Sequence, residues 1–270
     1  MNDDLSMEDL LNKIEERMRY ELRLRCESFV PNFEKPQVFS VLTALLARQT
    51  TLAIELSSAP QLWNSHSAPL FLRAMADVHI TLAWILLEPE ARAQQYIEHG
   101  LGQAVLDMEH RKKRMDSEDE TRKAELQTHI DGLRSWIDMQ RLNFIVEVNV
   151  GAWSGKTTRE MAEQAGLLEF YSHVYSPFSQ CAHSTWYHVG QLNSGLSDSP
   201  YTRLLWVPQI AESGTDPWNL ILAAKYLDKS FNAFDEKALG HPATSDIQTW
   251  ISDILAKDPD DEEVGDSVQN

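Results

Sequence analysis

Cysteine is scarce in this chain, and so are the glycine and proline that break helices. Cys26 and Cys181 are the two cysteines among 270 residues, which also include 11 Gly and 11 Pro. Two thiols cannot build the disulfide framework of a small secreted domain, and no C-x-x-C pair gives the spacing of a zinc site. We therefore expect reduced thiols in a cytoplasmic protein, with no metal and no other cofactor.

Basic residues are also in deficit. The chain has 24 Lys and Arg against 41 Asp and Glu, which gives a formal net charge of -17 at pH 7. This charge repels the phosphate backbone and argues against broad, non-specific nucleic-acid binding, whereas a focused basic site can still contact RNA. The densest basic cluster, residues 111–114, is followed at once by acidic residues. That pattern favours a solvated helix end over an RNA contact.

Long apolar runs free of charge are absent. The segment from Pro69 to Leu87 is nearly long enough to span a bilayer. Arg73, Asp77 and His79 interrupt it near its middle, where a bilayer disfavours ionised groups. The segment is therefore predicted to be a central helix of a soluble core, with no membrane partner. The acidic N-terminus has no apolar signal segment, so we expect no secretion signal.

Helical periodicity is what the chain has in abundance, and it predicts an all-α fold. Apolar residues recur three and four positions apart in nearly every segment. The predicted architecture is a helical bundle with a long antiparallel hairpin, whose arms run from Pro89 to about Met115 and from Glu118 to about Glu147. The other predicted helices cover about residues 6–26, 37–58, 67–87, 158–166, 167–175, 176–190, 217–234 and 245–256, with a loop at 190–203.

The chain divides into three predicted regions. Residues 1–35 form an N-terminal helical extension, and residues 36–256 form the main helical domain. Residues 257–270 are a strongly acidic tail with almost nothing apolar to bury, so we expect this tail to be disordered.

The stretch "NVGAWSGKTTREMA" contains Gly-Lys-Thr and resembles the phosphate-binding loop of nucleotide hydrolases. That loop requires G-x-x-x-x-G-K-[ST], and here Val150 stands at the position of the first glycine. The segment before it also continues a helical pattern, whereas the phosphate loop follows a strand. Thr157 and Glu160 instead match a capping box at the start of a short helix, which Gly166 ends.

Polar residues that interrupt apolar helices are the better candidates for chemistry. Arg73 and Asp77 are four apart and can pair on one helix face, as Ser179 and His183 can on another. One interpretation is a structural polar network that ties two helices together. The other is a functional site lined by a guanidinium, a carboxylate, a hydroxyl and an imidazole.

These residues resemble the motifs of a bacterial helical family of unknown function, in which an R-x-x-x-[ED] helix precedes an S-x-x-x-H helix. "RAMAD" and "YSHVYSPFSQCAH" carry the two motifs here, with Asp77 where Glu is usual. Trp153 and "MAEQAGLLEFYSHVY" fit the stretch between them, and the resemblance covers roughly residues 37–190. The architecture is also similar to the HEPN superfamily, which includes metal-independent RNases and components of toxin and phage-defence systems.

HEPN nucleases carry an R-x4–6-H signature, and the spacing of Arg73 and His79 satisfies it. Six residues of regular helix correspond to about 240° of rotation, so these two side chains point in different directions. His79 is therefore predicted to be a packed histidine, and His183, from another helix, is the expected partner of Arg73.

The resemblance implies a HEPN-like, metal-independent RNase or toxin effector in bacterial defence or stress response. His183 would be the general base or acid, Arg73 would stabilise phosphorane charge, Asp77 would orient Arg73, and Ser179 would hold the imidazole or the substrate. One alternative is a non-catalytic helical module that binds or regulates a partner protein. Another is a sensor of a small ligand or nucleotide that uses the same polar pocket. The expected partners are RNA, a protein encoded in the same operon, or a second copy in a homodimer.

Overall fold

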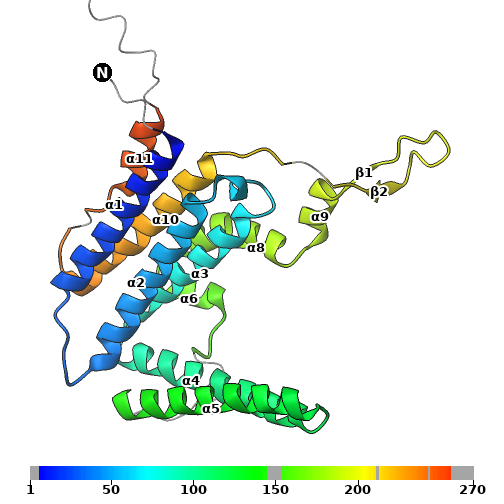
Figure 1. Cartoon of the computed structure of the whole chain (residues 1–270). Coiled ribbons are helices and arrows are strands. Elements are labelled where there is room, and N and C mark those ends of the chain that lie inside the picture. The colour runs from blue at the N-terminus through cyan, green and yellow to red at the C-terminus, as the bar shows by residue number, and fades with distance from the viewer. Residues whose placement is uncertain (1–5, 145–153, 211–212, 243, 257–270) are drawn as a thin grey trace, which may run out of the picture.

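The computed structural model describes residues 6–144, 154–210, 213–242 and 244–256, and the predicted acidic tail lies outside them. The fold is all-α, as the periodicity predicts (Figure 1). Its helices are α1 (Met7–Ser28), α2 (Pro36–Ser57), η1 (Pro60–Leu62), α3 (Ala68–Ile85), α4 (Pro89–Met115), α5 (Glu120–Phe144), α6 (Thr158–Gln164), α7 (Leu168–Phe170), η2 (Tyr171–Tyr175), α8 (Ser176–Ala182), α9 (Trp186–Leu192), α10 (Trp218–Phe234), η3 (Asp235–Leu239) and α11 (Ile247–Leu255). The described strands are β1 (Ser194–Leu196) and β2 (Trp206–Pro208), which pair antiparallel.

The core lies between α2, α3 and α10, which pack against one another. Leu46, Leu72 and Phe231 are fully buried at this junction, one from each helix. By length and composition both α2 and α3 could cross a bilayer, yet half of each apolar window is buried within the protein. The predicted central apolar helix is thus α3, packed inside a helical core.

Helix α1 belongs to the same core. Ile14 and Met18 are fully buried in the cluster that also contains the α2, α3 and α10 residues. Ser6, where the predicted first helix begins, caps α1, since its hydroxyl accepts a hydrogen bond from the Asp9 amide. The first described residues are therefore bound to the bundle through their apolar face.

The predicted long hairpin is present as α4 and α5, which pack along each other and lie across one end of the bundle (Figure 1). Leu101 and Ile137 form a small apolar cluster between the two arms. At the tip, Arg111 and Arg114 form ion pairs with Asp107 and Glu118, at 3.0 and 2.7 Å. This pairing supports the prediction of a solvated helix end at the basic cluster.

Two details of the helix ends differ from the predictions, one at Ser67, where the predicted central helix begins, and one at Ser184. Ser67 stands at the N-cap of α3, but its side chain makes no capping bond. Asn64 replaces it, because its Oδ1 accepts from the amides of His66 and Ser67 at 2.9 Å. The predicted helix from Ser176 to Gly190 is also wrong, because the chain passes from η2 into α8 and then breaks at Ser184, whose φ is 48°.

The π-helix η2 explains why no break occurs before Pro177. Proline has no amide hydrogen, and its ring crowds the carbonyl four residues earlier, which is that of His173. Here the Ser176 amide reaches back to the Tyr171 carbonyl, a wider turn that widens the helix just before the proline. A one-turn π-helix therefore carries the chain through a sequence that predicted a boundary.

The segment predicted to be a loop at 190–203 contains β1 and leads into β2. Each strand has only three residues, so neither shows a period-two pattern that sequence analysis could detect. Figure 1 shows this hairpin projecting away from the helices, beyond α9.

The predicted capping box is confirmed at the start of α6. The Thr157 hydroxyl accepts from the Glu160 amide at 3.2 Å, and the Glu160 carboxylate accepts from the Thr157 amide at 2.7 Å. Gly166, just after the helix, has a φ of 72°, as an αL helix end requires. The Gly-Lys-Thr sequence is a helix cap in this fold.

The cap gives a first prediction. Thr157→Ala should lower the free energy of unfolding by about 1 kcal/mol, because the Glu160 amide loses the hydroxyl that accepts its hydrogen bond. Lys156→Ala, one residue earlier, is the matched control and should leave both stability and nucleotide affinity unchanged. Urea denaturation of the two variants measures the difference. Specific ATP or GTP binding that disappears in Lys156→Ala would contradict the capping assignment.

Candidate functional site

Helix α3 presents Arg73 and Asp77 on one face, one turn apart. The Arg73 guanidinium donates through Nη1 to Asp77 Oδ2. The Arg73 side chain is 12% exposed and the Asp77 side chain 46% exposed. The predicted pair therefore exists at the edge of the core, with its carboxylate open to solvent.

The continuous helix η2–α8 supplies the other members of this site. Arg73 Nε donates to Ser179 Oγ at 2.6 Å. The Tyr175 ring lies under the guanidinium, with 3.3 Å between Arg73 Cζ and the ring centroid. We call Arg73, Asp77, Tyr175 and Ser179 the Arg73 cluster. Sequence reasoning missed Tyr175, although it stands four residues before Ser179 and so shares its helix face.

Burial changes the acidity of both acids in the cluster. It raises the pKa of Asp77 above the usual range, and this effect exceeds the opposing influence of Arg73 and of the hydrogen bond from Tyr175. Burial also raises the pKa of Tyr175, whose hydroxyl oxygen lies 3.3 Å from Thr158 Oγ1. A carboxyl group with a raised pKa is suited to proton transfer closer to neutral pH.

His183 is not brought to Arg73. Helix α8 runs antiparallel to α3, because Tyr175 lies beside Asp77 while the Cys181 thiol bonds the His66 carbonyl ahead of α3. His183 follows Cys181 and is exposed, whereas the guanidinium extends from Ser179 in the opposite direction. In the described part of the chain no bond or ring contact joins the two side chains. The catalytic roles assigned to the four residues stay predictions.

His79 is a packed histidine, as the helical geometry predicts. It is 3% exposed, its Nδ1 lies 3.1 Å from Ser230 Oγ, and its ring meets the Phe170 ring edge-on at 5.0 Å between centroids. Burial, helped by the nearby Lys229, lowers the pKa of His79 to about 3. The imidazole is therefore neutral at physiological pH and lies inside the core, away from the Arg73 cluster.

The buried imidazole gives a prediction about pH. Its folded pKa lies below the unfolded value, so its contribution to stability is present above about pH 6.5 and is lost as the pH falls toward 3. Between pH 7 and pH 5 the protonation of His79 in the unfolded state should lower the free energy of unfolding by about 2 kcal/mol. His79→Gln, which keeps a polar group near Ser230, should show a flatter decline over that interval in urea denaturation. Carboxyl groups with raised pKa values, such as Asp228 and Asp235, act in the opposite direction but are common to both proteins. Parallel stability curves for the two proteins would contradict a neutral buried His79.

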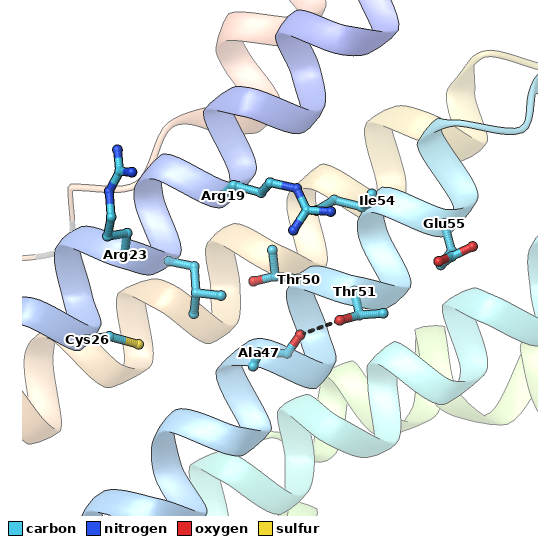
Figure 2. Close-up of a pocket in the computed structure, with 9 residues that line it drawn as sticks. Arg19, Arg23, Cys26, Ala47, Thr50, Thr51, Ile54 and Glu55 are labelled. Carbon is cyan, nitrogen blue, oxygen red and sulfur yellow. Dashed lines mark hydrogen bonds between the residues drawn. The ribbon is translucent and has the colours of Figure 1, made fainter.

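Within the described ranges, no group of three or more His, Cys, Asp or Glu side chains is placed to hold a metal ion. A hollow of about 400 Å³ lies between α1 and α2 and includes Cys26, Arg19 and Glu55 in its lining (Figure 2). Several of its polar groups are already engaged, since Arg19 pairs with Glu15 at 2.7 Å and Thr51 donates to the Ala47 carbonyl at 2.9 Å. It shares no residue with the Arg73 cluster, so a ligand there would not use the polar pocket expected from the sequence.

Comparison with known families assigns the chain to a family of unknown function. The sequence profile of the family of unknown function DUF5677 matches residues 39–199, more than half of the chain, and the protein belongs to that family. The matched region contains both helices that form the Arg73 cluster. Neither a curated protein nor a solved structure matches the chain.

Proposed function

We propose that this protein is a metal-independent endoribonuclease of HEPN-like type that acts as a toxin or defence effector, with the Arg73 cluster as its active site. One observation carries the proposal. At the surface of α3 and α8, a guanidinium, a carboxyl group with a raised pKa and two hydroxyl groups meet in one cluster. Convergence of perturbed acids and a cation is typical of a functional site.

The chemistry follows from what each group can do. Metal-independent RNA cleavage requires removal of the 2′-hydroxyl proton, stabilisation of charge on the phosphorane, and a proton for the leaving 5′-oxygen. Asp77 is placed to accept the first proton because it is half-exposed and its pKa is raised. Arg73 supplies the positive charge that stabilises the phosphorane. Ser179 and Tyr175 hold the Arg73 guanidinium in place. The leaving 5′-oxygen takes its proton from a solvent water molecule at the exposed side of the cluster.

A second candidate, the non-catalytic interaction module, is favoured by a different observation. The same arrangement recurs on α4, where Arg92 pairs with Glu88 and lies over the Trp84 ring at 3.9 Å from its centroid. The side-chain exposures there, 11% for Arg92 and 64% for Glu88, resemble those of Arg73 and Asp77. Arg92 also donates to the Trp84 carbonyl at 2.6 Å, so that cluster connects the end of α3 to α4. The Arg73 cluster could have the same structural use.

The recurrence provides a matched control for the test. The full-length protein is incubated with single-stranded RNA in EDTA, together with the variants Asp77→Asn and Glu88→Gln. The nuclease proposal expects cleavage by the wild type and by Glu88→Gln, and at least a 100-fold loss in Asp77→Asn. Growth arrest on overexpression should follow the same order. RNA left intact by the wild type would favour the interaction module, whereas equal cleavage by all three proteins would show that Asp77 is not part of the active site.

A further inference from the structure

A second feature of the molecule has no role in the proposed nuclease. Helix α9 and the β1–β2 hairpin form an extension that we call the arm, residues 186–210, whose hairpin projects from the bundle in Figure 1. Nine large apolar side chains are exposed on the arm: Trp186, Tyr187, Leu196, Tyr201, Leu204, Leu205, Trp206, Val207 and Ile210.

The exposed apolar area of the arm is large enough for a stable interface. Trp186, Tyr187, Tyr201 and Trp206 are 69%, 67%, 96% and 57% exposed. An aromatic side chain covers about 150–250 Å² when buried, so these four alone expose roughly 500 Å². Monomeric proteins seldom expose a larger contiguous apolar patch, and a stable interface covers about 800 Å² on each partner. The aliphatic residues of the arm bring its area into that range.

The arm also contains a shaped hollow. Trp186, Tyr187 and Trp206 line a groove of about 350 Å³ between α9 and the hairpin. A Cβ at Gly190 would meet the Trp186 ring at 3.0 Å, so the glycine lets the indole lie close against its own helix. An aromatic-lined groove of this kind accepts a single apolar side chain as an anchor, the usual arrangement at the centre of an interface.

Charge decides which partner fits. Across residues 186–210 the ionised side chains at pH 7 are Asp198 and Arg203, so the arm is neutral on a chain with a net charge of -17. Two copies of the chain repel each other over most of their surface, and a neutral arm is where they can approach at least electrostatic cost. A basic partner would instead be drawn to the acidic surface outside the arm. Anionic membranes would be repelled by the protein as a whole.

We propose that the arm is a homodimer interface in which two copies meet through the same surface. In this arrangement an exposed side chain of one hairpin, such as Tyr201 or Leu204, occupies the aromatic groove of the other copy. A two-fold axis makes the contact self-complementary and closes it at two chains. This proposal is independent of the proposed nuclease function, since no residue of the Arg73 cluster takes part in the dimer contact.

The test measures the mass of the full-length protein in solution. Sedimentation equilibrium at concentrations on the order of ten micromolar should give a dimer, since interfaces of this size support micromolar or tighter affinity. The triple variant Tyr201→Ser, Leu204→Ser, Ile210→Ser should be monomeric. These three side chains are 96%, 87% and 98% exposed, so the monomer fold loses few contacts, and an unchanged melting temperature verifies it. The control variant Phe33→Ser, Leu142→Ser removes apolar residues that are 89% and 80% exposed elsewhere and should stay dimeric.

Salt provides a second readout. Because both copies are acidic, raising the NaCl concentration should strengthen the dimer. A monomeric wild type, a dimer that survives the triple arm variant, or a dimer that salt dissociates would each overturn the proposal. Flotation of the monomer with neutral phosphatidylcholine vesicles, lost in the arm variant, would assign the arm to a lipid surface and would also contradict it.

Discussion

Arg25→Ala should lower the free energy of unfolding by about 3 kcal/mol, a large loss for a single polar side chain. Arg25 is 4% exposed and donates to the carboxylates of Glu21 at 2.8 Å and Asp235 at 2.6 Å. Its guanidinium also lies over the Phe231 ring, with 4.2 Å between Cζ and the ring centroid. Removing the guanidinium leaves the buried carboxylate of Asp235 without its ion-pair partner. Helix α1 then loses its polar connection to η3. The loss stays at the lower end of the usual range because Arg17 still pairs with Glu21.

The matched control is Arg23→Ala. Arg23 is exposed on the same helix and its guanidinium lies 5.6 Å from the Tyr20 ring centroid. Its removal should change stability by less than about 0.5 kcal/mol. Urea denaturation at pH 7 compares the two variants. Equal losses would show that the Arg25 network contributes nothing beyond a surface charge.

Arg73→Ala should reduce RNA cleavage by a factor of about 100 or more while the protein stays folded. The reason is that a preorganised cation facing a developing phosphorane charge is commonly worth that much in rate. The cost in stability should be smaller than for Arg25, about 1–2 kcal/mol, because Asp77 is 46% exposed and water can replace the guanidinium. Cleavage is measured under single-turnover conditions, and folding by the melting temperature.

Arg92→Ala is the control for that experiment, since Arg92 has the same kind of carboxylate and aromatic partners. It should lose stability to a similar or greater extent and keep its cleavage rate. If Arg73→Ala and Arg92→Ala lost cleavage rate in proportion to their loss of stability, the result would contradict a catalytic role for Arg73.

Much of the fold could be predicted because its helices are long and periodic. The α4–α5 hairpin, the central helix α3 and the capping box at Thr157 all depend on residues within a few positions of one another, and the structure confirms them. Two of the features that the sequence did not predict depend on other information. The β1–β2 hairpin has strands too short to show a pattern, and the π-helix carries the chain through Ser176 and Pro177, a pair that ordinarily starts a new helix.

The site divides in the same way. Arg73 and Asp77 pair within one helix, so their spacing alone predicts the contact. The bond from Arg73 to Ser179 joins residues 106 positions apart. The sequence resemblance brought the two motifs into one site, but it gave His183 as the partner of Arg73 and not Ser179. His183 directly follows α8, the helix that contains Ser179, but the direction of α8 relative to α3 carries it away from the guanidinium. The relative orientation of two helices that lie far apart in the sequence cannot be predicted from a local sequence pattern.

The double variant Arg73→Met, Asp77→Leu tests the central claim most directly. Apolar side chains can replace a partly buried ion pair at little cost, so the free energy of unfolding should stay within about 1 kcal/mol of the wild type. If the Arg73 cluster is an active site, this well-folded variant should no longer cleave RNA in EDTA, whereas the wild type does. Cleavage at the wild-type rate by a protein that lacks both the guanidinium and the carboxylate would contradict the account.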